Sequence, residues 1–170
     1  MKFFSKHLFH IYNYKAHQDF DGFENIQGFD DVKEIVNRAL DSEENFNLLF
    51  VGPPASSKTQ FLMEIMKSGK NCVYFDASNT TNRILQVLEE ERPEIVLLDE
   101  LDKMTRQFTE KLLNFLESGR VKVDQKNLQM DFELKGCKVF ATANDLSRLS
   151  RPLQSRFRKL FLPKYGLPIS

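Results

Sequence analysis

The chain has 170 residues, of which 41% are hydrophobic, and this is enough for one compact domain with a buried core. Its 24 basic and 24 acidic residues cancel, so bulk charge gives no argument for binding to nucleic acid or to an acidic partner. Two isolated cysteines indicate neither a disulfide framework nor a zinc site, and no apolar run reaches the roughly 18 residues of a membrane span, so we expect a cytoplasmic protein.

The N-terminal residues mix aromatic and basic side chains, and we expect residues 1–22 to form a segment that docks on this domain or on a neighbour. A core domain is expected over 23–163 and a short tail over 164–170. Within the core, apolar residues recur at helical spacing from Val32 to Leu40. This spacing predicts an amphipathic helix that starts near Asp30 and Asp31, because acidic residues favour a helix N-terminus.

Apolar runs bounded by turn residues predict five strands, at 47–51, 71–78, 94–100, 137–144 and 158–163. Helical patterns lie between most of them, at 59–67, 84–90 and 108–116. Strands that alternate with helices predict an α/β fold with a doubly wound sheet, which binds ligands at the carboxyl ends of its strands. Residues 119–134 alternate around the polar turn "DQKN" and predict an inserted β-hairpin.

The stretch "LLFVGPPASSKTQFL" (48–62) has the outline of a phosphate-binding loop, since a strand leads into Gly52 and then into Lys58 and Thr59. Lys58 is expected to bind the phosphates, Thr59 the magnesium ion, and the backbone N–H groups of the loop the anion. Ala55 and Ser57 stand where glycine is usual. Because Ser57 lies at the helix entrance, its dihedral angles are expected to be close to helical, and the loop is expected still to bind phosphate.

Two carboxylates follow the strand at 94–100, and a short amide follows the strand at 137–144. Asp99 can hold a magnesium ion through water, and Glu100 can orient or deprotonate an attacking water. Asn144 lies at the same edge of the predicted sheet and suits the binding of a water or a γ-phosphate oxygen. An unpaired charge at the end of a buried strand is costly, which favours a functional role for the two acids.

These segments, in this order, resemble the AAA+ ATPases. "FENIQGFDDVK" is similar to the segment that lies near the adenine in that family, "GPPASSKT" to its Walker A motif, "IVLLDE" to its Walker B motif and "ATAND" to its sensor 1 strand. The resemblance implies a P-loop NTPase whose five-stranded parallel sheet has helices on both faces and the strand order 5-1-4-3-2.

The resemblance also implies ATP and Mg²⁺ as ligands, catalytic roles for Glu100 and Asn144, and binding of the metal by Thr59 and Asp99. The nucleotide contacts that it implies are Ile26, Gly28, Gly52, Pro53, Pro54, Ala55, Ser56, Ser57, Lys58, Thr59 and Gln60. The segment "LSRPLQSRF" resembles the part of the family that carries the arginine finger. It implies that Arg156, with Arg151 as a second candidate, acts in trans in a ring, expected to be a hexamer.

The hairpin before the sensor 1 strand is a feature of the subgroup that includes RuvB, the MCM helicases, Lon and ClpX, and the segments that favour RuvB below resemble the MCM proteins equally. The runs "FATAND" and "LSRPLQSRF" favour a RuvB-like motor acting on branched or duplex DNA, whereas "LLDELDKM" is closer to Lon and ClpX, which act on protein substrates. A MoxR-like remodeller belongs to the same alternative. No helical lid is evident after residue 163, and this keeps a third reading open, a nucleotide-dependent assembly module with little turnover.

Overall fold

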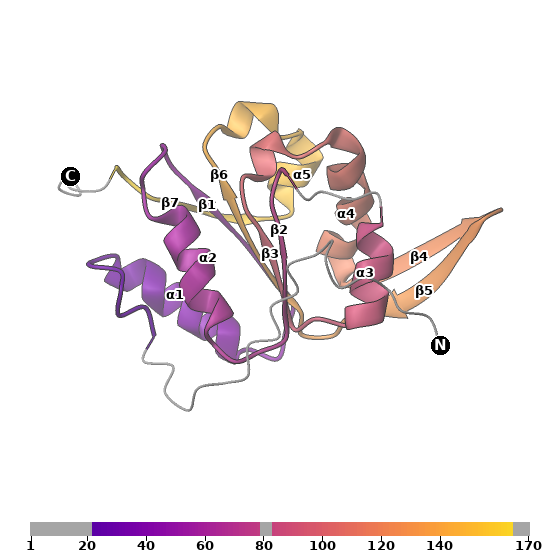
Figure 1. Ribbon diagram of the computed structural model, residues 1–170, viewed down its shortest axis with the longest axis horizontal. Coiled ribbons are helices and arrows are strands. Elements are labelled where there is room, and N and C mark those ends of the chain that lie inside the picture. The colour runs from indigo at the N-terminus through magenta and orange to yellow at the C-terminus, as the bar shows by residue number, and fades with distance from the viewer. Residues whose placement is uncertain (1–21, 79–82, 165–170) are drawn as a thin grey trace.

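The computed structural model describes residues 22–78 and 83–164, so the docking segment predicted at 1–22 and the tail predicted at 164–170 lie outside the described residues except for Gly22 and Lys164 (Figure 1). The α-helices are α1 (Asp30–Asp41), α2 (Lys58–Met66), α3 (Ile84–Glu91), α4 (Arg106–Ser118) and α5 (Arg151–Ser155). The strands are β1 (Phe46–Val51), β2 (Cys72–Phe75), β3 (Ile95–Leu98), β4 (Arg120–Gln125), β5 (Leu128–Glu133), β6 (Lys138–Ala143) and β7 (Arg158–Phe161).

Five of these strands form a parallel sheet in the order β2-β3-β6-β1-β7. When the hairpin strands β4 and β5 are left out and the remaining strands are renumbered in chain order, the order becomes 2-3-4-1-5. This is the expected order 5-1-4-3-2 read from the opposite edge of the sheet. Lys138 at the start of β6 pairs with Phe46 of β1 on one side and with Ile95 of β3 on the other. The three central strands therefore start at one level, and their carboxyl ends reach the same edge of the sheet.

Alternating residues of each strand enter two separate hydrophobic clusters, one on each face of the sheet. Leu48 and Phe50 pack with α1 and α2, whereas Leu49 and Val51 pack with α3, α4 and α5. Figure 1 shows α1 and α2 together on one side of the sheet and α3 and α4 on the other. The strands are buried on both faces, which explains why their sequences are continuous apolar runs. None of the helices in the described part of the chain has the length and apolar character needed to span a bilayer.

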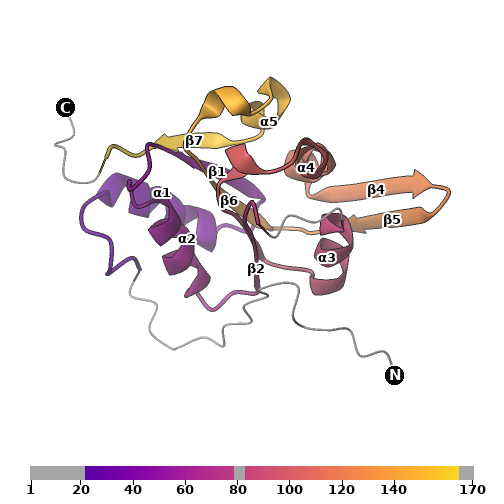
Figure 2. The ribbon, with the colours of Figure 1, turned by 45° about the horizontal axis from the view of Figure 1, so that its top comes forward.

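The hairpin β4–β5 extends away from the sheet in both views (Figures 1 and 2). Gly119 ends α4 with φ 71°, a left-handed conformation that suits glycine and turns the chain into β4. Val121, Met130 and Phe132 anchor one face of the hairpin in the cluster with α3 and α4. The other face is polar, so the hairpin presents an exposed surface that is held at a fixed place on the core.

The predicted boundaries were too long for four strands. The run at 137–144 forms β6 only over Lys138–Ala143. The run at 94–100 forms β3 only over Ile95–Leu98, the run at 71–78 forms β2 over Cys72–Phe75, and the run at 158–163 forms β7 over Arg158–Phe161. Asp99 and Glu100 consequently lie just beyond the end of β3, in the turn that leads to a short 3-10 helix at Leu101–Lys103.

Candidate nucleotide-binding site

A cavity of about 660 Å³ lies at the carboxyl ends of β1, β3 and β6. This is the edge at which open α/β sheets bind ligands, and the volume is in the range of small-molecule sites. Its lining combines the loop after β1, the start of α2, the two acids after β3 and the end of β6: Pro54, Ala55, Ser56, Ser57, Lys58, Thr59, Gln60, Asp99, Glu100, Thr142 and Asn144. Residues from three separate segments of the sequence, 54–60, 99–100 and 142–144, thus meet in one place.

The loop after β1 contains two non-glycine residues in the left-handed conformation, Ala55 with φ 62° and Ser57 with φ 64°. The prediction that Ser57 would be close to helical was wrong, because Ser57 is the residue that precedes α2 and the chain turns there through φ 64° and ψ 8°. Ser56, between them, does not have a positive φ. An anion-binding nest combines right-handed and left-handed residues so that successive N–H groups point into one concavity, and Ala55 and Ser57 provide left-handed residues for such a form.

Gly52, at the start of this loop, lies against the chain that follows β7. Its N–H donates a hydrogen bond to the carbonyl oxygen of Ala143 at 3.2 Å, and a Cβ atom added to it would overlap the carbonyl oxygen of Leu162. Glycine is therefore required here for close backbone approach rather than for an unusual φ.

Lys58 is 7% exposed, and its ammonium group is held by the loop itself. Nζ donates to the carbonyl oxygens of Gly52 at 2.8 Å and Pro53 at 2.6 Å and to Ser56 Oγ at 2.9 Å. Burial lowers the pKa of Lys58 below its usual value, and the nearby carboxylate of Asp102 partly opposes this. All three N–H donors of the ammonium group are thus satisfied by neutral oxygens. Phosphate oxygens would be stronger acceptors for them.

Asp99 is 6% exposed and accepts hydrogen bonds from three hydroxyl groups. Thr59 Oγ1 lies 3.2 Å from both carboxylate oxygens, Tyr74 Oη lies 2.9 Å from Oδ2, and Thr142 Oγ1 lies 2.5 Å from Oδ1. The Thr59 hydroxyl and the Asp99 carboxylate are the oxygen ligands that Mg²⁺ prefers, together with substrate phosphates and water. The donor set therefore fits a magnesium ion at the mouth of the loop.

Glu100 adopts a left-handed conformation, with φ 56° and ψ 50°, and its N–H donates to Thr142 Oγ1 at 2.8 Å. Its side chain is 41% exposed, and Oε1 pairs with Lys103 Nζ at 2.6 Å. The hydrogen bond to Glu100 raises the pKa of Lys103. One hydroxyl, that of Thr142, therefore ties the end of β6 to both acids, and a surface lysine holds the second acid.

Asn144 lies half-buried in the lining of the cavity, and its backbone is held by a carboxylate that the sequence analysis did not select. Asp102 Oδ2 accepts hydrogen bonds from the N–H groups of Asn144 at 3.3 Å and Asp145 at 3.1 Å. Asp102 thereby connects the turn after β3 to the turn after β6.

Tyr74, Thr142, Asp102 and Lys103 were all missed by the sequence analysis. Thr142 and Asp102 stand beside selected residues in "ATAND" and "DELD", so proximity to a motif was an available signal for them. Tyr74 had no such signal. It pairs with Leu97 in the sheet, and only this register brings its side chain next to Asp99, which lies two residues further along the chain, just beyond the end of β3.

Six of the predicted site residues lie outside the lining of the cavity. Gly52 and Pro53 directly precede the lining residue Pro54, and their carbonyl oxygens accept hydrogen bonds from Lys58 Nζ. Ile26 is 2% exposed and packs in the cluster with α1 and α2, and neither it nor Gly28 lines the cavity, so their place near an adenine stays a prediction. Arg156 follows α5 and pairs with Glu117 at 3.2 Å, and Arg151 is exposed at the start of α5. The role of Arg156 in a neighbouring subunit likewise stays a prediction.

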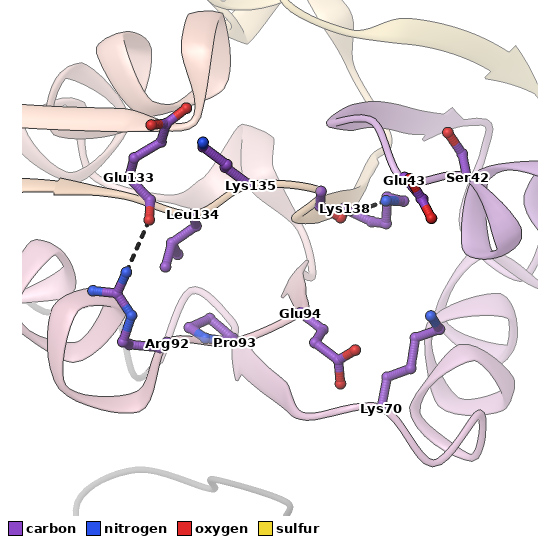
Figure 3. Close-up of a pocket in the computed structure, with 11 residues that line it drawn as sticks. Ser42, Glu43, Lys70, Arg92, Pro93, Glu94, Glu133, Leu134, Lys135 and Lys138 are labelled. Atoms are coloured by element: carbon purple, nitrogen blue, oxygen red, sulfur yellow. Dashed lines mark hydrogen bonds between the residues drawn. The ribbon is translucent and has the colours of Figure 1, made fainter.

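A second hollow, of about 420 Å³, lies at the opposite edge of the sheet (Figure 3). Helices α1, α2 and α3 end around it, and helix C-termini carry partial negative charge that favours nearby cations. Its lining holds four cations, Lys70, Arg92, Lys135 and Lys138, and three carboxylates, Glu43, Glu94 and Glu133. Figure 3 shows the Arg92 guanidinium group directed at the backbone carbonyl of Glu133, which it reaches at 2.9 Å. The lining therefore carries one more cation than carboxylates, and the partial negative charge of the helix C-termini lies beside these cations.

Comparison with known proteins gives one family. The model of the ATPase family associated with various cellular activities (AAA) matches residues 48–165, which is more than half of the chain. The match begins within β1 and includes every residue that lines the cavity. No curated protein matches the chain.

Proposed function

The chain belongs to the AAA family of ATPases, and from this premise we propose that it is an ATP-binding and ATP-hydrolysing module with its active site in the cavity at the ends of β1, β3 and β6. The observation that carries the proposal is the contact of Thr59 with Asp99, because it brings the phosphate-binding loop and the acid-bearing strand to one point. We place the ATPase core over 23–163, as the sequence predicts.

The proposed roles follow from the position of each group. The loop N–H groups and Lys58 bind the phosphates, and Thr59 and Asp99 hold the magnesium ion. When bound, the ion neutralises charge that develops on the phosphate oxygens. Glu100 accepts a proton from the attacking water, and Asn144 orients that water or a γ-phosphate oxygen. The left-handed turn at Glu100 supports this assignment, since strained backbone is found where a side chain must be aimed.

Two substitutions test the assignment of the site. Lys58→Ala is expected to abolish binding of a fluorescent ATP analogue, whereas Glu100→Gln is expected to keep that binding and to lose turnover by about 10²- to 10⁴-fold. Exposed Glu110→Gln on α4 is the matched control and should change neither quantity. Normal hydrolysis by Glu100→Gln would contradict the proposed general base.

We further propose that Arg156 completes the site of a neighbouring subunit in a ring. Its side chain is 30% exposed and pairs with a surface glutamate, Glu117, so it is accessible to a second copy of the chain. Arg156→Ala and Glu100→Gln are each expected to be inactive. A mixture of the two should regain activity, because some interfaces then combine an intact Glu100 with an intact Arg156. A mixture that stays inactive while both variants still assemble would contradict action in trans.

The finer proposal is a RuvB-like motor that couples hydrolysis to DNA branch migration or duplex remodelling. Its support is the extended hairpin, on which Lys122 and Lys126 have no ion pair among the described residues, whereas Arg120 pairs with Asp131 at 2.9 Å. Four-way-junction DNA should stimulate turnover, and replacing Lys122 and Lys126 by alanine should remove that stimulation without changing basal turnover. Stimulation by an unfolded protein instead would favour the protein-remodelling alternative. Tight ATP binding with negligible turnover in every assembly state would favour the assembly module.

A further inference from the structure

The carboxylate of Asp99 is held by hydroxyl groups from two other strands as well as by the loop. Thr142 of β6 donates to Oδ1 at 2.5 Å, and Tyr74 of β2 donates to Oδ2 at 2.9 Å. Each carboxylate oxygen therefore has one donor on the sheet side. Thr59, which lies 3.2 Å from both oxygens, is the one donor from the loop.

The Tyr74 hydroxyl is well suited to a permanent role as a donor. A phenol is protonated near neutral pH, so the Tyr74 hydroxyl is able to donate to the carboxylate throughout the physiological range. Its ring packs partly buried against the cluster that contains α1 and α2, and this packing restricts where the hydroxyl can go. Tyr74 is not among the residues that line the cavity, so it has no contact there with a nucleotide.

We propose that Tyr74 is a positioning residue of the magnesium site, which fixes the orientation of the Asp99 carboxylate through Oδ2. The proposal rests on the proposed ATPase function and deepens it. An ionised carboxylate has about four acceptor positions, and Tyr74 and Thr142 together occupy one on each oxygen. The positions that remain serve the Thr59 hydroxyl and a metal-bound water. Without the tyrosine hydroxyl, Oδ2 has no donor on the sheet side, and only Thr142 on Oδ1 and the longer contacts of Thr59 restrain rotation of the carboxylate about its Cβ–Cγ bond.

The variant that isolates this effect is Tyr74→Phe, because it removes one oxygen and keeps the ring. Loss of a hydrogen bond to a metal-binding carboxylate costs about 10- to 100-fold in metal affinity. We expect a shift of that size in the concentration of Mg²⁺ that half-saturates the protein–ATP complex. The affinity for a fluorescent ATP analogue in EDTA should be unchanged, since Tyr74 does not line the cavity.

The test measures metal affinity directly and does not depend on turnover. Mn²⁺ binding to the complex with a non-hydrolysable ATP analogue is followed by electron paramagnetic resonance, and the Mg²⁺ concentration that displaces it is recorded. Thr109→Val is the control, because it also removes a hydroxyl, one that bonds only to the carbonyl of Arg106 within α4. A melting temperature within about 2 °C of wild type verifies that the variant is folded.

The outcomes separate the two levels of the proposal. Wild-type protein that binds neither nucleotide nor Mn²⁺ would overturn the proposed function and this inference with it. Wild-type protein that binds both, with Tyr74→Phe unchanged in Mn²⁺ affinity, would overturn the role of Tyr74 alone. Weaker nucleotide binding by Tyr74→Phe in EDTA would also overturn it, since the residue would then act on the loop and not on the metal. Should Tyr74→Phe not fold, Tyr74→Leu, which also removes the hydroxyl and keeps an apolar side chain at this partly buried position, is measured in its place against the same predictions.

Discussion

Replacement of Ser57 by glycine is expected to stabilise the protein, although glycine usually destabilises. Ser57 has φ 64°, and a left-handed conformation costs a non-glycine residue about 1–2 kcal/mol. The same substitution increases the conformational entropy of the unfolded chain, which costs about 0.4–1 kcal/mol. Ser57 makes no capping hydrogen bond with its side chain, so no contact of that kind is lost. The difference of these two ranges is about 0–1.6 kcal/mol, so the central expectation is a net gain of about 0.8 kcal/mol.

Thermal unfolding measures this gain. For a domain of this length, about 1 kcal/mol raises the melting temperature by roughly 2–4 °C, so Ser57→Gly is expected to raise it by about 1–4 °C. Glu89→Gly, at an exposed position within α3, is the matched control and should lower stability by about 0.5–1 kcal/mol. If Ser57→Gly melts at or below the wild-type temperature while the control behaves as expected, the loop does not store the strain inferred from its dihedral angles.

Three further substitutions test other features of the structure. Gly52→Ala should lower the free energy of unfolding in denaturant by about 1–3 kcal/mol, because the added Cβ atom would overlap the carbonyl oxygen of Leu162. An unchanged denaturant midpoint would show that the loop after β1 and the chain after β7 are not in contact. Lys103→Met should raise ATP turnover about two- to fivefold at low salt, because it frees Glu100 from an exposed ion pair, and should raise it less at high salt, because salt also weakens that pair. Equal turnover of the variant and the wild type at every salt concentration would contradict this. Lys138→Met should gain most stability over wild type near neutral pH and lose that advantage as the pH approaches 10.5. Burial lowers the pKa of Lys138 in the folded state, so between that lowered pKa and 10.5 the unfolded chain binds more protons than the folded chain, and wild-type stability rises with pH. A difference between the unfolding free energies of the variant and the wild type that stays constant with pH would exclude this.

The arrangement of strands and helices was accessible from the sequence because it depends on periodicity. Leu48 and Leu49 are both buried, and successive residues of β1 enter the two clusters on opposite faces of the sheet. A continuous apolar run predicts a strand that is buried on both faces in this way. The order of the motifs then placed Lys58, Asp99 and Asn144 at one edge, since parallel strands end together. In the folded chain these three residues lie in the lining of one cavity.

Dihedral angles in the loop were decided only by the tertiary structure. Nothing in the identity of Ser57 distinguishes a helical from a left-handed residue, and the choice follows from how the loop must connect β1 to α2 while Gly52 lies against Leu162. The sequence pattern predicts where a turn occurs, but the path of the turn depends on what it packs against.

The hydrogen bonds around the two acids were also decided by the fold. Tyr74 lies 25 residues from Asp99 in the chain, and Thr142 lies 43 residues from it. Which side chains meet across such separations depends on strand register, and a shift of one residue would direct each of them to the opposite face of the sheet. Local spacing therefore determined which residues carry the chemistry of the candidate site, and the register of β2, β3 and β6 determined which residues hold them in place.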